Sequence, residues 1–261
     1  MPVRLNDLAA DIHRRMAEDD RFGYSWAERY GAYPERWDVD GVSIEIKVGD
    51  YDCSSSSITA WRLALGAAGR RDPLAGASYT GNMRAAFLAT GLFEWAPVTR
   101  ARRGDLYLNE ANHVAMAQAD YPGPLSEFSS NEHGGAYGGA RGDQTGWEAH
   151  VCGFYQYPWD GCLHYTGTEE VLTDKEKEEA RMTIEEIKQA IWGFKGKWVN
   201  FDGKIAPSKA DANQLLNQAG RVWSYRNPKL EKADAYQILR DIRDGVERVE
   251  GKLDELGKRL G

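Results

Sequence analysis

Long apolar runs and clusters of basic residues are both missing from this sequence. Residues 1–20 are polar and amphipathic where the apolar core of a secretory signal would lie, so we expect no signal peptide and synthesis in the cytoplasm. No apolar run reaches the length of a membrane helix, so we expect no membrane span. The formal charge is −7 without a Lys/Arg run, which argues against a nucleic-acid partner.

Cysteine is also scarce. Three residues, Cys53, Cys152 and Cys162, exclude a disulfide framework, because at most one pair could form and one thiol would remain. A remaining thiol in a suitable setting is a candidate nucleophile. The 42% hydrophobic content, in contrast, is enough to fill a real core.

The apolar patterning predicts helices in the first part of the chain and then a run of strands. Apolar residues at helical spacing indicate the helices, alternation of apolar and polar residues indicates the strands, and turn residues separate the elements. The expected helices cover 5–17, 53–69 and 82–90, and the expected strands cover 42–48, 104–108, 113–118, 125–130, 149–155 and 162–165. This order predicts an α+β domain with a mostly antiparallel sheet over residues 1–170.

Composition changes after residue 170. We expect a linker helix over 171–181 and a small helical region over 182–261, which contains a near-repeat around Trp192 and Trp223. Over 235–260 apolar residues recur at heptad spacing. This stripe predicts either a coiled-coil-like helix that joins copies of the chain into a homo-oligomer, or one amphipathic helix that lies on a domain.

The segment Tyr51-Asp52-Cys53-Ser54-Ser55 is the sharpest chemical signal. It places Cys53 where an extended segment ends and a helix begins. There the helix dipole and the first-turn amides should favour thiolate, lower the thiol pKa and stabilise an oxyanion. The alternative is a buried structural cysteine, the commonest fate of a free thiol.

A thiolate nucleophile needs a base. His113 begins a strand after a turn-like segment and is favoured by its position, whereas His13 lies beside Arg14 and Arg15 and should be a solvated surface residue. The alternative for His113 is a histidine held by its strand neighbours. A polar residue on the next strand should orient the imidazole. Glu127 is the first choice, with Asn131 and Glu132 as alternatives.

A competing constellation is a zinc site. His150-x-Cys152 and Cys162-x-His164 mirror each other, so a hairpin could gather two Cys and two His around one ion. The spacing is not a standard zinc pattern. We therefore favour the nucleophile and expect no metal.

Together, the motifs YDCSSS, GDLYL, NHVAM, LSEFSSNEHGG and GDQTG resemble the phage peptidoglycan amidase family of endolysins, an NlpC-like branch of the papain-like cysteine hydrolases. The resemblance covers roughly residues 24–165. It implies Cys53 as nucleophile and His113 as base. It places the third polar residue at Glu127, where many relatives have His. Tyr24 resembles a tyrosine that can donate to the oxyanion, although the insertion before the cysteine motif is long.

The same resemblance implies that Asp52 and Ser54 border the peptide stem of the substrate, and we expect Tyr51 to belong to the same substrate-binding and oxyanion group. It implies a cofactor-free endolysin that leaves the host cytoplasm through a holin or on a virion and then acts on bacterial peptidoglycan. The expected bond is the N-acetylmuramoyl–L-alanine amide. A D-glutamyl stem-peptide endopeptidase with the same mechanism and a non-catalytic wall-binding or virion protein remain alternatives. The C-terminal region would bind a wall polymer or only oligomerise.

Overall fold

The computed structural model describes residues 2–72, 74–178, 198–199 and 205–206. The chain divides into two compact units, with a boundary between Asp174 and Lys175. The first unit extends slightly past residue 170, because strand β10 (Glu170–Val171) pairs with β1 (Val3–Arg4) near the amino terminus. Val171 is buried, so this pairing fastens the end of the unit to its beginning.

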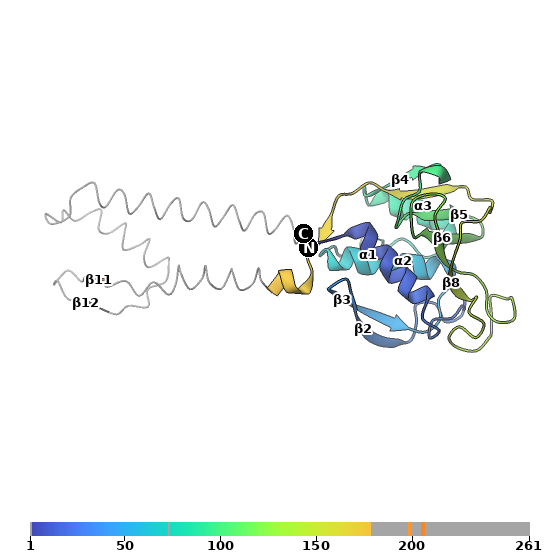
Figure 1. Ribbon diagram of the computed structural model, residues 1–261, viewed down its shortest axis with the longest axis horizontal. Coiled ribbons are helices and arrows are strands. Elements are labelled where there is room, and N and C mark those ends of the chain that lie inside the picture. Colours follow the sequence, from blue (N-terminus) through green and yellow to red (C-terminus); the bar gives the residue numbers. More distant parts are fainter. Residues whose placement is uncertain (1, 73, 179–197, 200–204, 207–261) are drawn as a thin grey trace. The chain divides into compact units, whose positions relative to one another are not determined.

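A six-stranded sheet forms the centre of the first unit (Figure 1). All of its neighbouring strands are antiparallel, which confirms the expected α+β class with an antiparallel sheet. In spatial order the strands are β4 (Phe93–Ala96), β9 (Gly161–Tyr165), β5 (Leu106–Asn109), β6 (His113–Ala117), β7 (Leu125–Phe128) and β8 (Ala149–Cys152).

The two faces of the sheet are buried by different parts of the chain. Helices α1 (Leu5–Ala17) and α2 (Cys53–Ala67) pack together and against β6 and β7, while α3 (Thr80–Ala89) packs near β4 and β9. A second, smaller apolar cluster joins Tyr107 and Leu125 to Tyr155 and Trp159, from the segment between β8 and β9. The short 3-10 helix η1 (Val98–Arg100) contacts β9, and its Val98 packs against this smaller cluster.

The long insertion before the cysteine motif is a β-hairpin. Strand β2 (Tyr33–Val39) pairs in antiparallel register with β3 (Val42–Val48). Asp40 and Gly41 connect them, and both have positive φ, at 52° and 81°. A two-residue Asp-Gly loop in this conformation matches the right-handed twist of paired strands. Through β3, the hairpin packs on α2, the helix that carries Cys53.

His13 is buried, so the expectation of a solvated surface residue is wrong. Its Nδ1 lies 2.6 Å from Ser126 Oγ and its Nε2 lies 3.1 Å from Ser56 Oγ. Ser56 already donates its hydroxyl proton to the carbonyl of Cys53, so it accepts from His13 Nε2–H. Burial lowers the pKa of His13 to about 3, and the ring is neutral at physiological pH.

In the second unit, β11 (Trp198–Val199) pairs with β12 (Ile205–Ala206) in antiparallel register, where the sequence predicted only helix. The near-repeat around Trp192 and Trp223 and the heptad stripe over 235–260 lie outside the described residues. Among the described residues, no helix is long and apolar enough to cross a membrane.

Candidate active site

Cys53 is the first residue of α2 because Asp52 caps this helix. The Asp52 Oδ1 accepts a hydrogen bond from the Ser55 amide at 2.6 Å, and the Asp52 amide donates to Ser55 Oγ at 2.9 Å. This reciprocal capping box satisfies amides that the helix itself leaves without partners. The helix therefore begins at the residue that the sequence marked as the nucleophile.

The sulfur of Cys53 lies against strand β6. The backbone amides of Val114 and Ser54 are near enough to favour the anionic form of this sulfur, and the nearby Arg29 guanidinium also favours it. Burial and the Asp52 carboxylate oppose these contacts and raise the thiol pKa to about 12. The expectation of a lowered pKa is therefore wrong for the free protein, because desolvation outweighs the helix amides.

His113 is the first residue of β6, directly before the residue whose amide contacts Cys53. Its Nε2 donates to Glu127 Oε2 over 2.7 Å, and its ring stacks on Trp159 with 5.8 Å between ring centroids. Tyr157 contacts the same ring edge-on. Since Glu127 engages Nε2, the tautomer that donates this bond carries its lone pair on Nδ1.

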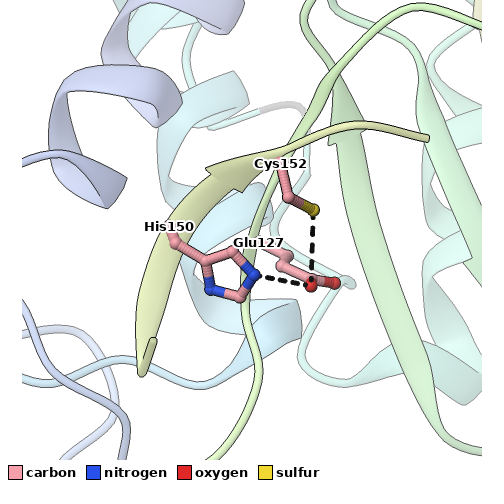
Figure 2. Close-up of side chains that lie close together, drawn as sticks. All are labelled: Glu127, His150 and Cys152. Carbon is pink, nitrogen blue, oxygen red and sulfur yellow. Dashed lines mark hydrogen bonds and ion pairs between the residues drawn. The ribbon is translucent and has the colours of Figure 1, made fainter. Parts of the chain in front are cut away.

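Glu127 is the hub of the polar cluster around His113. Its Oε2 also accepts from the Tyr155 hydroxyl at 2.6 Å, and its Oε1 lies 3.2 Å from His150 Nε2. Figure 2 shows the contacts to His150 and Cys152. Burial acts to raise the pKa of Glu127, but the hydrogen bonds from His113, His150 and Tyr155 outweigh it and hold the pKa below its ordinary range. The carboxylate is therefore ionised and suited to orient an imidazole.

Tyr24 lies close enough to Cys53 for the two groups to interact electrostatically, and its backbone forms a parallel bridge with Tyr51. The Tyr24 oxygen accepts from Trp26 Nε1 at 2.8 Å, which leaves its own hydroxyl proton available for donation. Burial and the neighbouring Cys53 raise the pKa of Tyr24, so the phenol stays protonated.

Arg29 contacts two of the expected substrate-contacting residues, Asp52 and Ser54, and no sequence motif pointed to it. Its Nε lies 2.6 Å from Asp52 Oδ2, and its terminal nitrogen donates to Ser54 Oγ at 2.9 Å and to the Ser78 carbonyl. Tyr51 is placed differently from Asp52 and Ser54. Its ring is in the core and its hydroxyl donates to the Lys47 carbonyl, so its side chain is used structurally.

The two alternatives for the third residue hold the glycine-rich loop after β7. Asn131 hydrogen-bonds the carbonyls of Tyr137 and Gly138, and Glu132 accepts from the Ala140 amide at 2.7 Å. Of the three candidates on this stretch, Glu127 is the one that contacts His113.

The four-ligand zinc hairpin does not form. Strands β8 and β9 lie apart in the sheet, separated by β5, β6 and β7. His164 Nδ1 is 2.6 Å from Asp105 Oδ2, and Cys162 contacts the Pro97 carbonyl. His150 and Cys152 instead lie beside Glu127, which local spacing could not show because the pairing of Glu127 with His150 depends on strand register.

Residues 2–121 match the family model of the endolysin-like domain. This stretch contains Cys53 and His113 and ends before Glu127, His150 and Tyr155. No curated protein and no solved structure matches the chain. The match supports an endolysin-like family for the first unit.

Proposed function

We propose that this chain is a phage cell-wall hydrolase that cleaves an amide bond of peptidoglycan with Cys53 as its nucleophile. The match to the endolysin-like domain supports the cell-wall role. The observation that carries the chemistry is the contact of the Cys53 sulfur with the amide of Val114, one residue after a histidine that is held by an ionised carboxylate. Thiol, imidazole and carboxylate are the parts that cysteine hydrolases combine.

In the proposed reaction, the Cys53 thiol gives its proton to His113 Nδ1 while its sulfur attacks the carbonyl carbon of the scissile amide. The imidazolium then gives that proton to the leaving nitrogen, the C–N bond breaks, and an acyl thioester remains on Cys53. Water attacks the thioester, His113 takes the water proton, and the proton returns to sulfur as the acid is released. Glu127 keeps the ring oriented and stabilises its charged form.

The high pKa of the Cys53 thiol determines when its proton is transferred. A thiol with a pKa of about 12 is almost fully protonated at neutral pH, so the thiolate does not accumulate before substrate arrives. Proton transfer to His113 must therefore accompany attack on the carbonyl. The amides of Val114 and Ser54 stabilise the negative sulfur while this happens.

The negative oxygen of the tetrahedral intermediate needs donors of its own. The Cys53 amide belongs to the first turn of α2, where backbone N–H groups have no partner within the helix. The Tyr24 hydroxyl retains a proton to donate, and its neighbour Cys53 is the attacking group. We assign the oxyanion to these two donors.

For the bond that is cut, we favour the N-acetylmuramoyl–L-alanine amide. The exposed side chains of Trp26 and Tyr137 pack edge to face with 5.4 Å between ring centroids, and Trp26 also contacts Tyr24. Aromatic side chains of this kind can pack against the apolar faces of a sugar, as an amidase that binds the glycan next to the scissile bond requires. An endopeptidase would cut within the stem and need no glycan there.

The test is digestion of purified peptidoglycan by the full chain, followed by mass spectrometry of the products. New L-alanine amino termini would support the amidase, whereas new termini inside the stem would identify an endopeptidase. Cys53→Ala should release neither, and Cys162→Ser is the matched control because Cys162 lies on β9 beside Pro97. Equal product release by Cys53→Ala and the unaltered chain would refute the mechanism. No release by the unaltered chain would favour a non-catalytic wall-binding or virion protein.

The remaining expectations belong to the same proposal. The enzyme would be made in the host cytoplasm and reach the wall through a holin or on a virion. The region after residue 181 would bind a wall polymer or join copies of the chain through 235–260. Light scattering on the full chain and on a chain that ends near residue 232 tests the second role, since equal monomeric masses would exclude it.

A further inference from the structure

Three potential metal ligands converge beside the proposed catalytic histidine. Glu127, His150 and Cys152 each offer one ligand atom, and these atoms all lie within 4.8 Å of one another. Figure 2 shows the His150 and Cys152 side chains of β8 directed toward the Glu127 carboxylate of β7. Strand register explains the cluster, because Glu127 pairs with His150 and Cys152 follows two residues later on the same side of β8.

The two distances from the Glu127 oxygen to the other ligand atoms are close to those of a tetrahedral zinc site. Glu127 Oε1 is 3.2 Å from His150 Nε2 and 4.0 Å from Cys152 Sγ. Zinc bonds of about 2.0 Å to oxygen and nitrogen and about 2.3 Å to sulfur, at a tetrahedral angle, separate such ligands by roughly 3.3 and 3.5 Å. The carboxylate and the imidazole already have this separation, and the sulfur needs to approach the carboxylate oxygen by about 0.5 Å.

The surrounding contacts orient the ligands as metal sites require. His150 Nδ1 lies 3.1 Å from the Trp147 carbonyl, to which it donates, so Nε2 faces the carboxylate. The second oxygen of Glu127 accepts from His113 and Tyr155, which fixes the carboxylate plane. Metal-binding histidines and carboxylates are commonly held by such outer contacts.

Charge also favours a divalent ion. With Nδ1 bonded to Trp147, a proton or a cation must lie between His150 Nε2 and the Glu127 carboxylate. A divalent cation replaces this proton and the thiol proton of Cys152. The carboxylate, imidazolium and thiol sum to zero charge, as do the cation, carboxylate, imidazole and thiolate, so the exchange buries no net charge.

We propose that Glu127, His150 and Cys152 form a binding site for one zinc-type divalent ion. A thiolate and an imidazole select zinc or cobalt over magnesium and calcium, which prefer oxygen ligands. The site differs from the four-ligand hairpin that the sequence offered, because Cys162 and His164 take no part in it. Its regulatory consequence rests on the proposed function. The ion draws electron density from the carboxylate that supports His113, and wall hydrolysis is inhibited.

Binding is tested by cobalt titration of the full chain carrying Cys53→Ser, under reducing conditions. A thiolate–cobalt charge-transfer band should appear and saturate at one equivalent per chain, and magnesium in excess should not remove it. Cys152→Ser in the same background should abolish the band. The matched control Cys162→Ser should keep it. His150→Gln should weaken binding by more than about 100-fold, beyond the usual effect of an outer contact.

Loss of the band on Cys162→Ser, or its persistence in Cys152→Ser, would overturn the site. No band at millimolar cobalt in the Cys53→Ser chain, with a near-ultraviolet circular dichroism spectrum unchanged from the unaltered protein, would overturn it equally. This readout uses a chain without the proposed nucleophile, so it is independent of catalysis. Regulation is tested separately. The zinc concentration that halves wall digestion should be at least tenfold lower for the unaltered chain than for the Cys152→Ser variant. Equal inhibition of the two proteins would refute the regulatory role alone.

Discussion

Replacing Glu127 with Gln should destabilise the fold in a way that depends on pH. The carboxylate accepts hydrogen bonds from His113 at 2.7 Å and from Tyr155 at 2.6 Å, and it faces His150 at 3.2 Å. Glutamine has the same shape but no charge. Its amide nitrogen is itself a donor, so it would face either the donors His113 and Tyr155 or the His150 ring without accepting a hydrogen bond from them. Loss of a buried, charge-assisted contact of this kind costs about 3 kcal/mol of unfolding free energy.

The pH dependence follows from two opposite shifts. Glu127 has a lowered pKa in the folded state, so its contribution is present above its unfolded pKa of about 4.5 and declines as the pH falls below that value. His150 has a raised pKa, because of its hydrogen bond to Glu127, so its contribution is present below about pH 6.5 and is lost as the pH rises through the folded pKa. The difference between the two proteins should therefore be largest between about pH 4.5 and 6.5.

Urea unfolding of both proteins from pH 4 to pH 9, followed by tryptophan fluorescence, measures this difference. The control is Glu94→Gln, which removes the exposed carboxylate that pairs with Arg100 and should cost at most about 1 kcal/mol. A difference for Glu127→Gln that is below about 0.5 kcal/mol, or that stays constant across the range, would refute the assignment of Glu127 as the charged hub.

Three further changes test the surroundings of the site. Gly23→Ala should destabilise the protein by about 1–3 kcal/mol in thermal unfolding, because its Cβ would collide with the Gly142 carbonyl; a neutral effect would mean that this close approach is absent. Arg29→Met should slow wall digestion and lower stability by about 1–2 kcal/mol through the lost ion pair to Asp52, and unchanged rates would exclude Arg29 as an organiser of the site. In the unaltered protein, the free energy of unfolding should fall as the pH is lowered from 6.5 to about 3, and His13→Gln should remove this fall, as measured by urea unfolding. Unfolding of the unaltered protein takes up a proton there, because burial lowers the pKa of His13, so an identical pH profile would contradict a neutral His13.

The sequence predicted best those elements whose period and end signals agree. The bounds of α1 and β3 match the expected segments, and α2 begins at Cys53 as its capping residues indicate. Strand β2 was missed although Asp40-Gly41 was a readable hairpin signal, because Pro34 and the charged side chains of this exposed strand obscure its alternation.

The candidate site shows where local patterns stop being sufficient. The order of Cys53, His113 and Glu127 could be read from the sequence, and the structure joins the last two directly. The contribution of His150 and Tyr155 depends on strand register and on the path of the chain after β8. The helix-start argument for Cys53 was sound for the amides but omitted desolvation, which only the packed structure reveals.

The proton relay between Cys53 and His113 is the central claim, and alkylation of Cys53 by iodoacetamide at pH 7 tests it most directly. A thiol with a pKa of about 12 and no base would be only ~10⁻⁵ ionised and nearly inert. With the relay, Cys53 should label faster than Cys152 and Cys162, as resolved by peptide mass spectrometry, and His113→Ala should slow its labelling at least tenfold. Equal labelling of Cys53 with and without the imidazole would contradict the mechanism.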